Sequence, residues 1–214
     1  MASSIASLDA HGLAEGVKYL CEREPVFDAI VKKYGPPPLW AREPGFPTLV
    51  HIILEQQVSL ASARACFDKL LIRLPTLTPE HFLGLADEAL LDIGYSRQKT
   101  RYTRNLAQKI FDGHLKLDDF NQMEDEKVFK KLVSLTGIGP WTANIYLLMA
   151  LRRPDIWPAG DLALVVAIQA LFRLDARPTA DEFQSFSEKW RPYRAVAARI
   201  LWHYYLSAKE KQTI

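Results

Sequence analysis

Apolar residues recur along the chain at intervals of three and four positions, whereas strict alternation of apolar and polar residues is nearly absent. One such stripe is formed by Leu60, Ala63, Phe67, Leu70, Leu71 and Leu74. This spacing places apolar side chains on one face of a helix. The pattern predicts an all-α fold of about ten short helices.

Local capping signals support the helical assignment. Thr78 followed by Pro79 supplies an N-cap and a proline at the first helical position, where its missing N–H costs nothing. Thr179 with Glu182 has the spacing of a capping box, and Gly94 fits a helix end. These signals predict where several helices begin and end.

Two irregular segments interrupt the helical pattern. Prolines concentrate from Tyr34 to Pro47, and a second break runs from Arg152 to Gly160. We therefore expect one helical lobe from residues 46–152 and a second lobe formed by both chain ends, residues 1–45 plus 153–214. Such a layout would place a cleft where the chain crosses between the two lobes.

Composition excludes several classes of protein. The 214 residues are 49% hydrophobic and 24% charged, as in a globular protein, and the net charge of +2 requires any nucleic-acid-binding surface to be local. Cys21 and Cys66 are too few for a disulfide framework or a four-cysteine iron–sulfur cluster. No signal-peptide pattern or membrane-length apolar run is present, so a soluble protein in a reducing compartment is expected.

A glycine-containing turn lies between two predicted helices, Glu126–Leu135 and Trp141–Leu151. This arrangement is a helix-hairpin-helix. Gly137 and Gly139 permit close backbone approach, and the amides at the start of the second helix favour an anion such as a DNA phosphate. The alternative is a structural turn in which the glycines only relieve steric strain.

The segment between Asp92 and Asp112 has no acidic residue. Its basic residues are Arg97, Lys99, Arg101, Arg104 and Lys109. They fit either a phosphate-binding helix or a solvated helix face.

Asp161 follows the sequence WPAG and precedes the apolar run LALVVAIQALF. Its carboxylate is expected to accept from the first amides of a helix that begins near Leu162, as an N-cap does. From these residues alone, the N-cap is the preferred interpretation of Asp161.

The sequence LTGIGPWTAN followed by AGDLAL resembles the helix-hairpin-helix (HhH-GPD) DNA glycosylases, whose motif ends in an aspartate that Asp161 matches. The stretches FPTLVHIILEQQVSLASA, LDIGYSRQKTRYTRNLA and KWRPYRAVAARILWHYY are similar to the alkylpurine branch, the bacterial 3-methyladenine DNA glycosylase II group. The resemblance implies two helical lobes flanking a DNA-binding cleft, in a compact form without the N-terminal β domain of some members.

The resemblance implies a monofunctional glycosylase of base excision repair. Such an enzyme flips out alkylated purines, of the 3-methyladenine and 7-methylguanine type, and hydrolyses the N-glycosidic bond to leave an abasic site. Asp161 is then the catalytic residue. Relatives that also cut the backbone carry a lysine where this chain has Trp141, so no Schiff-base nucleophile is expected.

Further roles follow from the resemblance. The base pocket would be formed by Trp141, Trp202, Ile145, Leu162 and Tyr146. The DNA phosphates would be bound by Gly137, Gly139, Thr142, Arg97 and Lys99. A structural Na⁺ or K⁺ would be held by the backbone carbonyls of Val133, Leu135 and Ile138. Gln57, or alternatively Gln56, would be the wedge that fills the gap left by the flipped base. Both glutamines also fit an exposed helix end. The tryptophans also fit positions in the hydrophobic core.

Two other functions use the same features: a glycosylase for deaminated bases such as hypoxanthine or uracil, and a non-catalytic DNA-binding repair scaffold. In each case we expect a monomer that binds double-stranded DNA and does not associate with a membrane. We expect no other cofactor. The expected location is the bacterial cytoplasm, in association with the nucleoid, or the nucleus of a eukaryote.

Overall fold

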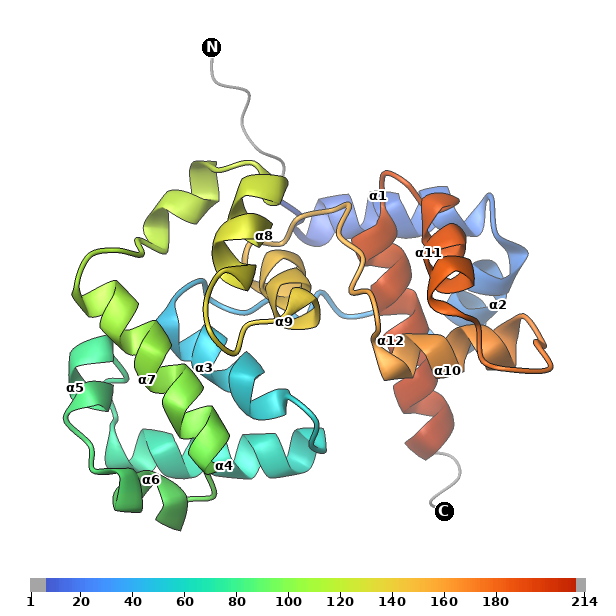
Figure 1. Cartoon of the computed structure of the whole chain (residues 1–214). Helices are drawn as coiled ribbons and strands as arrows, with labels where there is room; N and C mark the ends of the chain where they lie inside the picture. Colours follow the sequence, from blue (N-terminus) through green and yellow to red (C-terminus); the bar gives the residue numbers. More distant parts are fainter. Residues whose placement is uncertain (1–6, 211–214) are drawn as a thin grey trace. The chain divides into compact units, whose positions relative to one another are not determined.

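The computed structural model describes residues 7–210, and every regular element within them is helical (Figure 1). The described chain holds twelve α-helices, one 3₁₀-helix and one π-helix, which confirms the all-α class. The number exceeds the expected ten because two of the helices, in the segment between residues 79 and 92, have only five and six residues. Helices of that length are too short to show a clear apolar period.

The chain divides into two compact units. Of the described residues, unit 1 comprises Arg42–Leu151, and unit 2 comprises residues 7–41 and 152–210. Each unit has its own buried apolar residues.

Unit 1 is built around a central helix, α3 (Phe46–Glu55). Its other elements are α4 (Leu60–Arg73), α5 (Pro79–Leu83), α6 (Asp87–Asp92), α7 (Arg97–Phe111), η1 (Asp118–Gln122), α8 (Asp125–Val133), α9 (Pro140–Ile145) and the π-helix η2 (Tyr146–Ala150). Leu49, Ile52 and Ile53 of α3 are fully buried. Helices α4, α7 and α9 pack against α3, so this helix is apolar almost all round, as a core helix must be.

The capping signals of unit 1 act as the sequence predicts. The hydroxyl of Thr78 accepts a hydrogen bond from the His81 amide at the start of α5. Gly94 follows α6 with a φ of 105°, a left-handed conformation that favours glycine. Both helix boundaries are therefore set by short-range chemistry.

The helix-hairpin-helix consists of α8, a turn and α9. The second helix was expected to continue regularly to Leu151, but it changes to π geometry at Tyr146, and the Leu151 amide donates to the Tyr146 carbonyl at 3.1 Å. The Tyr146 hydroxyl accepts from the Gly45 amide at 3.0 Å, which fixes this side chain inside unit 1. A π turn inside an α-helix adds a residue to the turn and reorients the side chains around it.

Unit 2 is built around the long helix α12 (Arg194–Glu210), which contacts four other helices. These are α1 (Ala10–Cys21), α2 (Pro25–Tyr34), α10 (Leu162–Leu171) and α11 (Ala180–Glu188). The capping box at Thr179 and Glu182 is present as predicted.

Trp190 is buried against Phe27, Trp157 and other aromatic rings, so it is a core residue.

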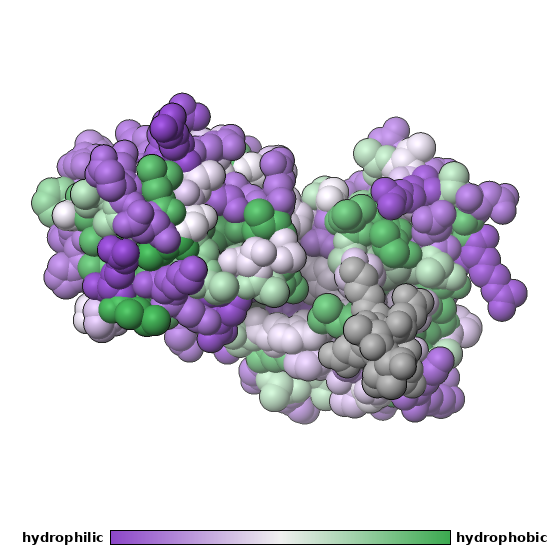
Figure 2. Space-filling model, turned by 90° about the horizontal axis from the view of Figure 1, so that it is seen from below, coloured by the Kyte–Doolittle hydropathy of each residue, from purple (hydrophilic) through white to green (hydrophobic). Residues whose placement is uncertain are grey.

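The surface seen in Figure 2 carries hydrophobic residues interspersed among hydrophilic ones. The exposed large apolar side chains include two in one turn of unit 1, Val58 and Leu60, and Leu162 at the start of α10. Among the described helices, none combines the length and the apolar character that crossing a membrane requires.

Candidate functional site

Asp161 is the N-cap of α10, as the sequence predicts. Its Oδ1 accepts a hydrogen bond from the Leu164 amide at 3.0 Å, and the side chain is buried, with 8% of the residue exposed. The N-terminal dipole of a helix favours negative charge at this position. The helix formed by the apolar run therefore holds the Asp161 carboxylate in place at its N-terminus.

Trp202 of α12 makes a second contact with the same carboxylate. Its indole N–H donates to Asp161 Oδ1 at 3.1 Å. Both of these groups donate an N–H, and the carboxylate oxygen accepts. The sequence left Trp202 as either a base-pocket or a core residue. The structure shows that it is buried, with 8% of the residue exposed, and that it orients Asp161, whereas contact with a base stays a prediction.

The residues expected to form a base pocket differ in exposure. Leu162 is 60% exposed beside Asp161, and Trp141 is partly exposed at the second position of α9. Ile145 and Tyr146 are buried, with 2% and 0% of the residue exposed. The expectation that these two contact a base is not supported, because the helix turns them into the interior, where Tyr146 packs against Phe120.

The hairpin turn depends on a residue that the sequence analysis missed. Gly137 has a φ of 88°, and a Cβ at this position would overlap the ring of Tyr102 from α7. The Tyr102 hydroxyl in turn accepts from Gln98 Nε2 at 2.6 Å. The first glycine therefore serves packing as well as the turn, and only its contact with an element more than thirty residues away shows this.

The second glycine of the turn has open surroundings. Gly139 is exposed, has an ordinary φ of −87°, and a Cβ there would meet nothing within 4 Å. Thr142, by contrast, is buried, and its Oγ1 accepts from Gln56 Nε2 at 2.9 Å. The Thr142 side chain is therefore engaged by Gln56, whereas the Gly139 backbone is accessible, and phosphate binding by these residues stays a prediction.

The basic segment forms α7, and its side chains divide into two groups. Lys99 Nζ donates to the Leu54 carbonyl at 2.7 Å, and burial lowers the pKa of this lysine. Arg104 binds Asp87 and two backbone carbonyls. Lys99 is thus engaged inside unit 1 and does not fit the expected phosphate contact, whereas Arg97 and Arg101 are exposed.

The turn between α3 and α4 carries the two candidate wedge residues. Gln57 is exposed and has a φ of 56°, a conformation that is unusual for a residue with a side chain and that often marks functional positions. Gln56 is half-buried, and its side-chain amide donates to the Gly137 carbonyl and to Thr142. The side chain of Gln56 is therefore engaged, whereas that of Gln57 is exposed, and the wedge role stays a prediction. Leu60, assigned to the buried stripe of α4, is 61% exposed because it is the first residue of that helix.

The expected cation ligands lie at the C-terminal end of α8, where the helix dipole is negative. Val133 is the last residue of α8, and the Leu135 carbonyl accepts from the Ile138 amide at 3.1 Å while keeping a second lone pair. The binding of a monovalent cation by these backbone oxygens stays a prediction. Within residues 7–210, no group of three or more His, Cys, Asp or Glu side chains is placed to hold a metal ion.

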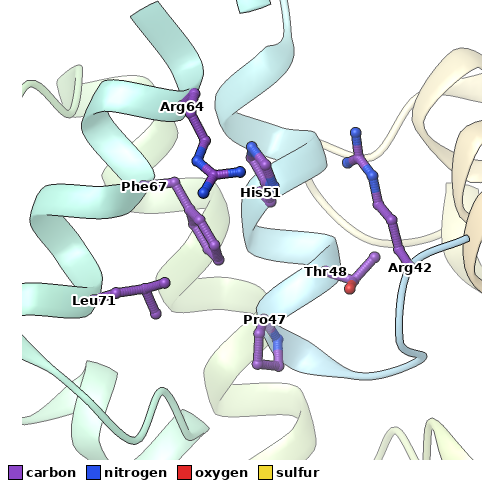
Figure 3. A pocket seen from close by; sticks show the side chains of 7 residues that line it. All are labelled: Arg42, Pro47, Thr48, His51, Arg64, Phe67 and Leu71. Atoms are coloured by element: carbon purple, nitrogen blue, oxygen red, sulfur yellow. The ribbon is translucent and has the colours of Figure 1, made fainter. Parts of the chain in front are cut away.

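A pocket of about 450 Å³ opens between α3 and α4 in unit 1 (Figure 3). Arg42, Arg64 and the stacked rings of His51 and Phe67 line it. The guanidinium of Arg42 is paired with Glu55 through two hydrogen bonds. None of the residues expected to bind a base lines this pocket, so it is separate from the predicted chemistry.

Comparison with known proteins connects these features. Two curated relatives from Bacillus subtilis are 37% and 32% identical, and the chain covers 43% and 41% of their lengths, less than half of each. The second is named DNA-3-methyladenine glycosylase, and the match covers 58% of this chain. DNA-3-methyladenine glycosylase 1 from Schizosaccharomyces pombe is 26% identical over 92% of this chain and 85% of its own.

The fold has a close counterpart among solved structures. A Schizosaccharomyces pombe 3-methyladenine DNA glycosylase, in complex with abasic DNA, matches with a TM-score of 0.80 at 24% identity, over 88% of this chain and 95% of the other. Residues 50–192, more than half of the chain, match the family described as HhH-GPD superfamily base excision DNA repair protein. This protein belongs to the HhH-GPD superfamily.

Proposed function

We propose that this protein is a monofunctional DNA glycosylase that removes alkylated purines from double-stranded DNA and leaves an abasic site. The observation that carries the proposal is the carboxylate of Asp161, capped by the Leu164 amide and oriented by the Trp202 indole, in a member of a base excision repair superfamily. The relatives named as DNA-3-methyladenine glycosylases support the substrate class. A monomer carries every residue that the proposal requires.

The damaged nucleotide must leave the base stack before its glycosidic bond can be attacked. Unstacking and unpairing cost a few kcal/mol, and a side chain that fills the vacated space offsets part of that cost. Gln57, exposed in a left-handed conformation at the α3–α4 turn, is the proposed wedge. Its amide can donate to and accept from the base that has lost its partner.

Asp161 is the proposed catalytic residue. As the bond between C1′ and the base nitrogen breaks, its electron pair leaves with the base and positive charge develops on the deoxyribose. A fixed carboxylate stabilises that charge without having to reorganise. Water then adds to C1′, and its proton passes to Asp161 or to solvent.

The base-binding side chains suit a cationic purine. Alkylation at N3 or N7 gives the purine a formal positive charge, so it departs without a general acid and is attracted to an aromatic face. Within unit 2, the exposed Leu162 supplies apolar surface beside the carboxylate. Within unit 1, Trp141 is a partly exposed aromatic ring of the kind that attracts such a base. Trp141 also stands where lyase relatives place their lysine, so strand cleavage is not part of the reaction.

The proposed phosphate anchor is the hairpin turn at Gly139, where the backbone is exposed and unobstructed. Arg97 and Arg101 on α7 add positive charge. A monovalent cation on the carbonyls of Val133, Leu135 and Ile138 would increase the attraction for a phosphate near the turn.

The test is release of free base from duplexes that each carry one defined lesion: 3-methyladenine, 7-methylguanine, hypoxanthine or uracil. Asp161→Asn keeps the side-chain oxygen that caps α10 but removes the charge, so base release should fall by about a hundredfold or more. Strand breaks should form only after alkali or heat.

Asp9→Asn is the matched control. Asp9 caps α1 through the Gly12 amide at 2.7 Å in the same way, but it is exposed. This variant should release base at the wild-type rate. Full activity of Asp161→Asn would refute the catalytic role, and release of only the deaminated bases would refute the substrate class.

A further inference from the structure

Helix α3 ends in a turn that exposes one glutamine and ties down its neighbour. The Gln56 amide donates to the Ile53 carbonyl at 3.3 Å, and the chain then reverses at Gln57 through a φ of 56°. Ser59 caps the next helix, α4, by accepting from the Ser62 amide. Gln57 is therefore the tip of a short turn held at both ends by helix caps.

The side chain of Gln56 bridges this tip and the helix-hairpin-helix. Its Nε2 donates to the Gly137 carbonyl and to Thr142 Oγ1, both at 2.9 Å. Gly137 lies in the hairpin turn, and Thr142 lies in the first turn of α9. One amide thereby uses both of its N–H donors to hold the hairpin turn and the start of α9 against the end of α3.

Two contacts from α7 fix the same junction. Lys99 Nζ donates to the carbonyl of Leu54, two residues before Gln56. The ring of Tyr102 packs on Gly137 so closely that no Cβ would fit there. The hairpin turn and the α3–α4 turn therefore cannot shift relative to each other without breaking buried or half-buried contacts.

We propose that Gln56 is a positioning residue that sets the place of the Gln57 wedge relative to the phosphate-binding turn. The inference rests on the proposed function and deepens it. If the turn that carries Gln57 were flexible, part of the free energy gained on insertion would be lost in ordering it. A turn that is already ordered in the free protein avoids this entropic cost. Binding a phosphate at Gly139 thus delivers Gln57 to a defined position in the duplex.

The first test replaces Gln56 with Met, which keeps the length of the side chain and removes both N–H donors. Base release from a duplex should fall about tenfold, the effect of losing one or two hydrogen bonds that hold the wedge. Release from the same lesion in a single strand should stay within about twofold of the wild type, because a single strand needs no wedge. Equal loss on both substrates would show a merely structural role and overturn the inference.

A double-mutant cycle identifies the route of the effect. If Gln56 acts through Gln57, then Gln56→Met should have no further effect in a Gln57→Ala background. Multiplicative effects would show that the two residues act independently and would overturn the inference. Thr142→Val removes one acceptor and should give a smaller loss in the same direction, so the test stands even if Gln56→Met folds poorly.

Gln108→Met is the matched control, because Gln108 also donates through Nε2 in unit 1 but is exposed and binds Asp112. It should behave as the wild type. A binding readout separates this inference from the proposed function: 2-aminopurine fluorescence opposite a non-hydrolysable abasic analogue reports wedge insertion without catalysis. Gln56→Met should lower that signal even if no lesion is hydrolysed, and an unchanged signal would refute the positioning role.

Discussion

The indole N–H of Trp202 and the backbone amide of Leu164 donate to the same carboxylate oxygen, Oδ1 of Asp161. One donor comes from α12 and the other from the first turn of α10, two helices that pack against each other in unit 2. The carboxylate is therefore fixed in two directions. Its orientation depends on a tertiary contact as well as on the local cap.

Trp202→Phe removes this donor and keeps an aromatic ring. We expect kcat for base release to fall about tenfold, since a hydrogen bond to a charged group contributes about 1.5–3 kcal/mol. KM should change little, because Phe keeps an aromatic ring at this buried position and only the hydrogen bond to Asp161 is lost. Multiple-turnover kinetics on one alkylated duplex measures both parameters.

Trp190→Phe provides the control for that experiment. Trp190 is also buried in unit 2, but its Nε1 has no hydrogen-bond partner within residues 7–210, and its ring packs among Phe27, Trp157 and Phe186. Replacing it should affect stability and leave kcat unchanged. A loss of kcat equal to that of Trp202→Phe would show that general loosening of unit 2, rather than the contact with Asp161, causes the effect.

The two glycines of the hairpin should respond differently to alanine. Gly137→Ala combines a left-handed φ with overlap of the Tyr102 ring, so the free energy of unfolding should fall by about 2–4 kcal/mol. Gly139→Ala meets open space and should cost less than about 1 kcal/mol. Only the second variant should keep its stability while losing affinity for duplex DNA, as measured by denaturant unfolding and by fluorescence anisotropy. Intact DNA affinity in Gly139→Ala would place the phosphate elsewhere.

Short-range features of the site could be predicted from the sequence. Asp161 as an N-cap, the hairpin and the basic helix each depend on a few neighbouring residues, whose side chains compete for nearby backbone groups in a known way. The same locality explains why the caps at Thr78 and Thr179 were placed correctly.

Contacts between distant segments could not be predicted. Trp202 donates to a carboxylate 41 positions earlier, and Gln56 donates to a carbonyl 81 positions later. Which helix faces meet depends on the packing of whole helices, and one apolar period fits several packings. For the same reason Lys99 was assigned to phosphate binding, although the structure points its ammonium at the end of α3.

Replacing different basic residues of α7 should change the salt dependence of DNA affinity by different amounts. Arg97→Ala and Arg101→Ala should each reduce the slope of log affinity against log salt concentration by about one, if each contacts a phosphate. Lys99→Met should leave the slope unchanged and lower the free energy of unfolding by about 1–2 kcal/mol, because its bond to Leu54 is lost. Titrations of undamaged duplex at several salt concentrations test this. A reduced slope for Lys99→Met would return that lysine to the DNA interface.

His51 should make stability depend on pH. The His51 ring stacks on the Phe67 ring, with 4.3 Å between the ring centroids. Burial lowers the pKa of His51 below the ordinary 6.5. The negative charge of Glu55 opposes this shift, and the positive charge of Arg42 reinforces it. The unfolded chain therefore takes up a proton at a higher pH than the folded protein does. Stability is fully present above about pH 6.5 and is lost as the pH falls from there through the folded pKa. His51→Phe keeps the stack and removes the titration, so its thermal midpoint should fall less than that of the wild type between about pH 7.5 and pH 5.5. An equal or larger fall in the variant would assign the pH dependence to other groups.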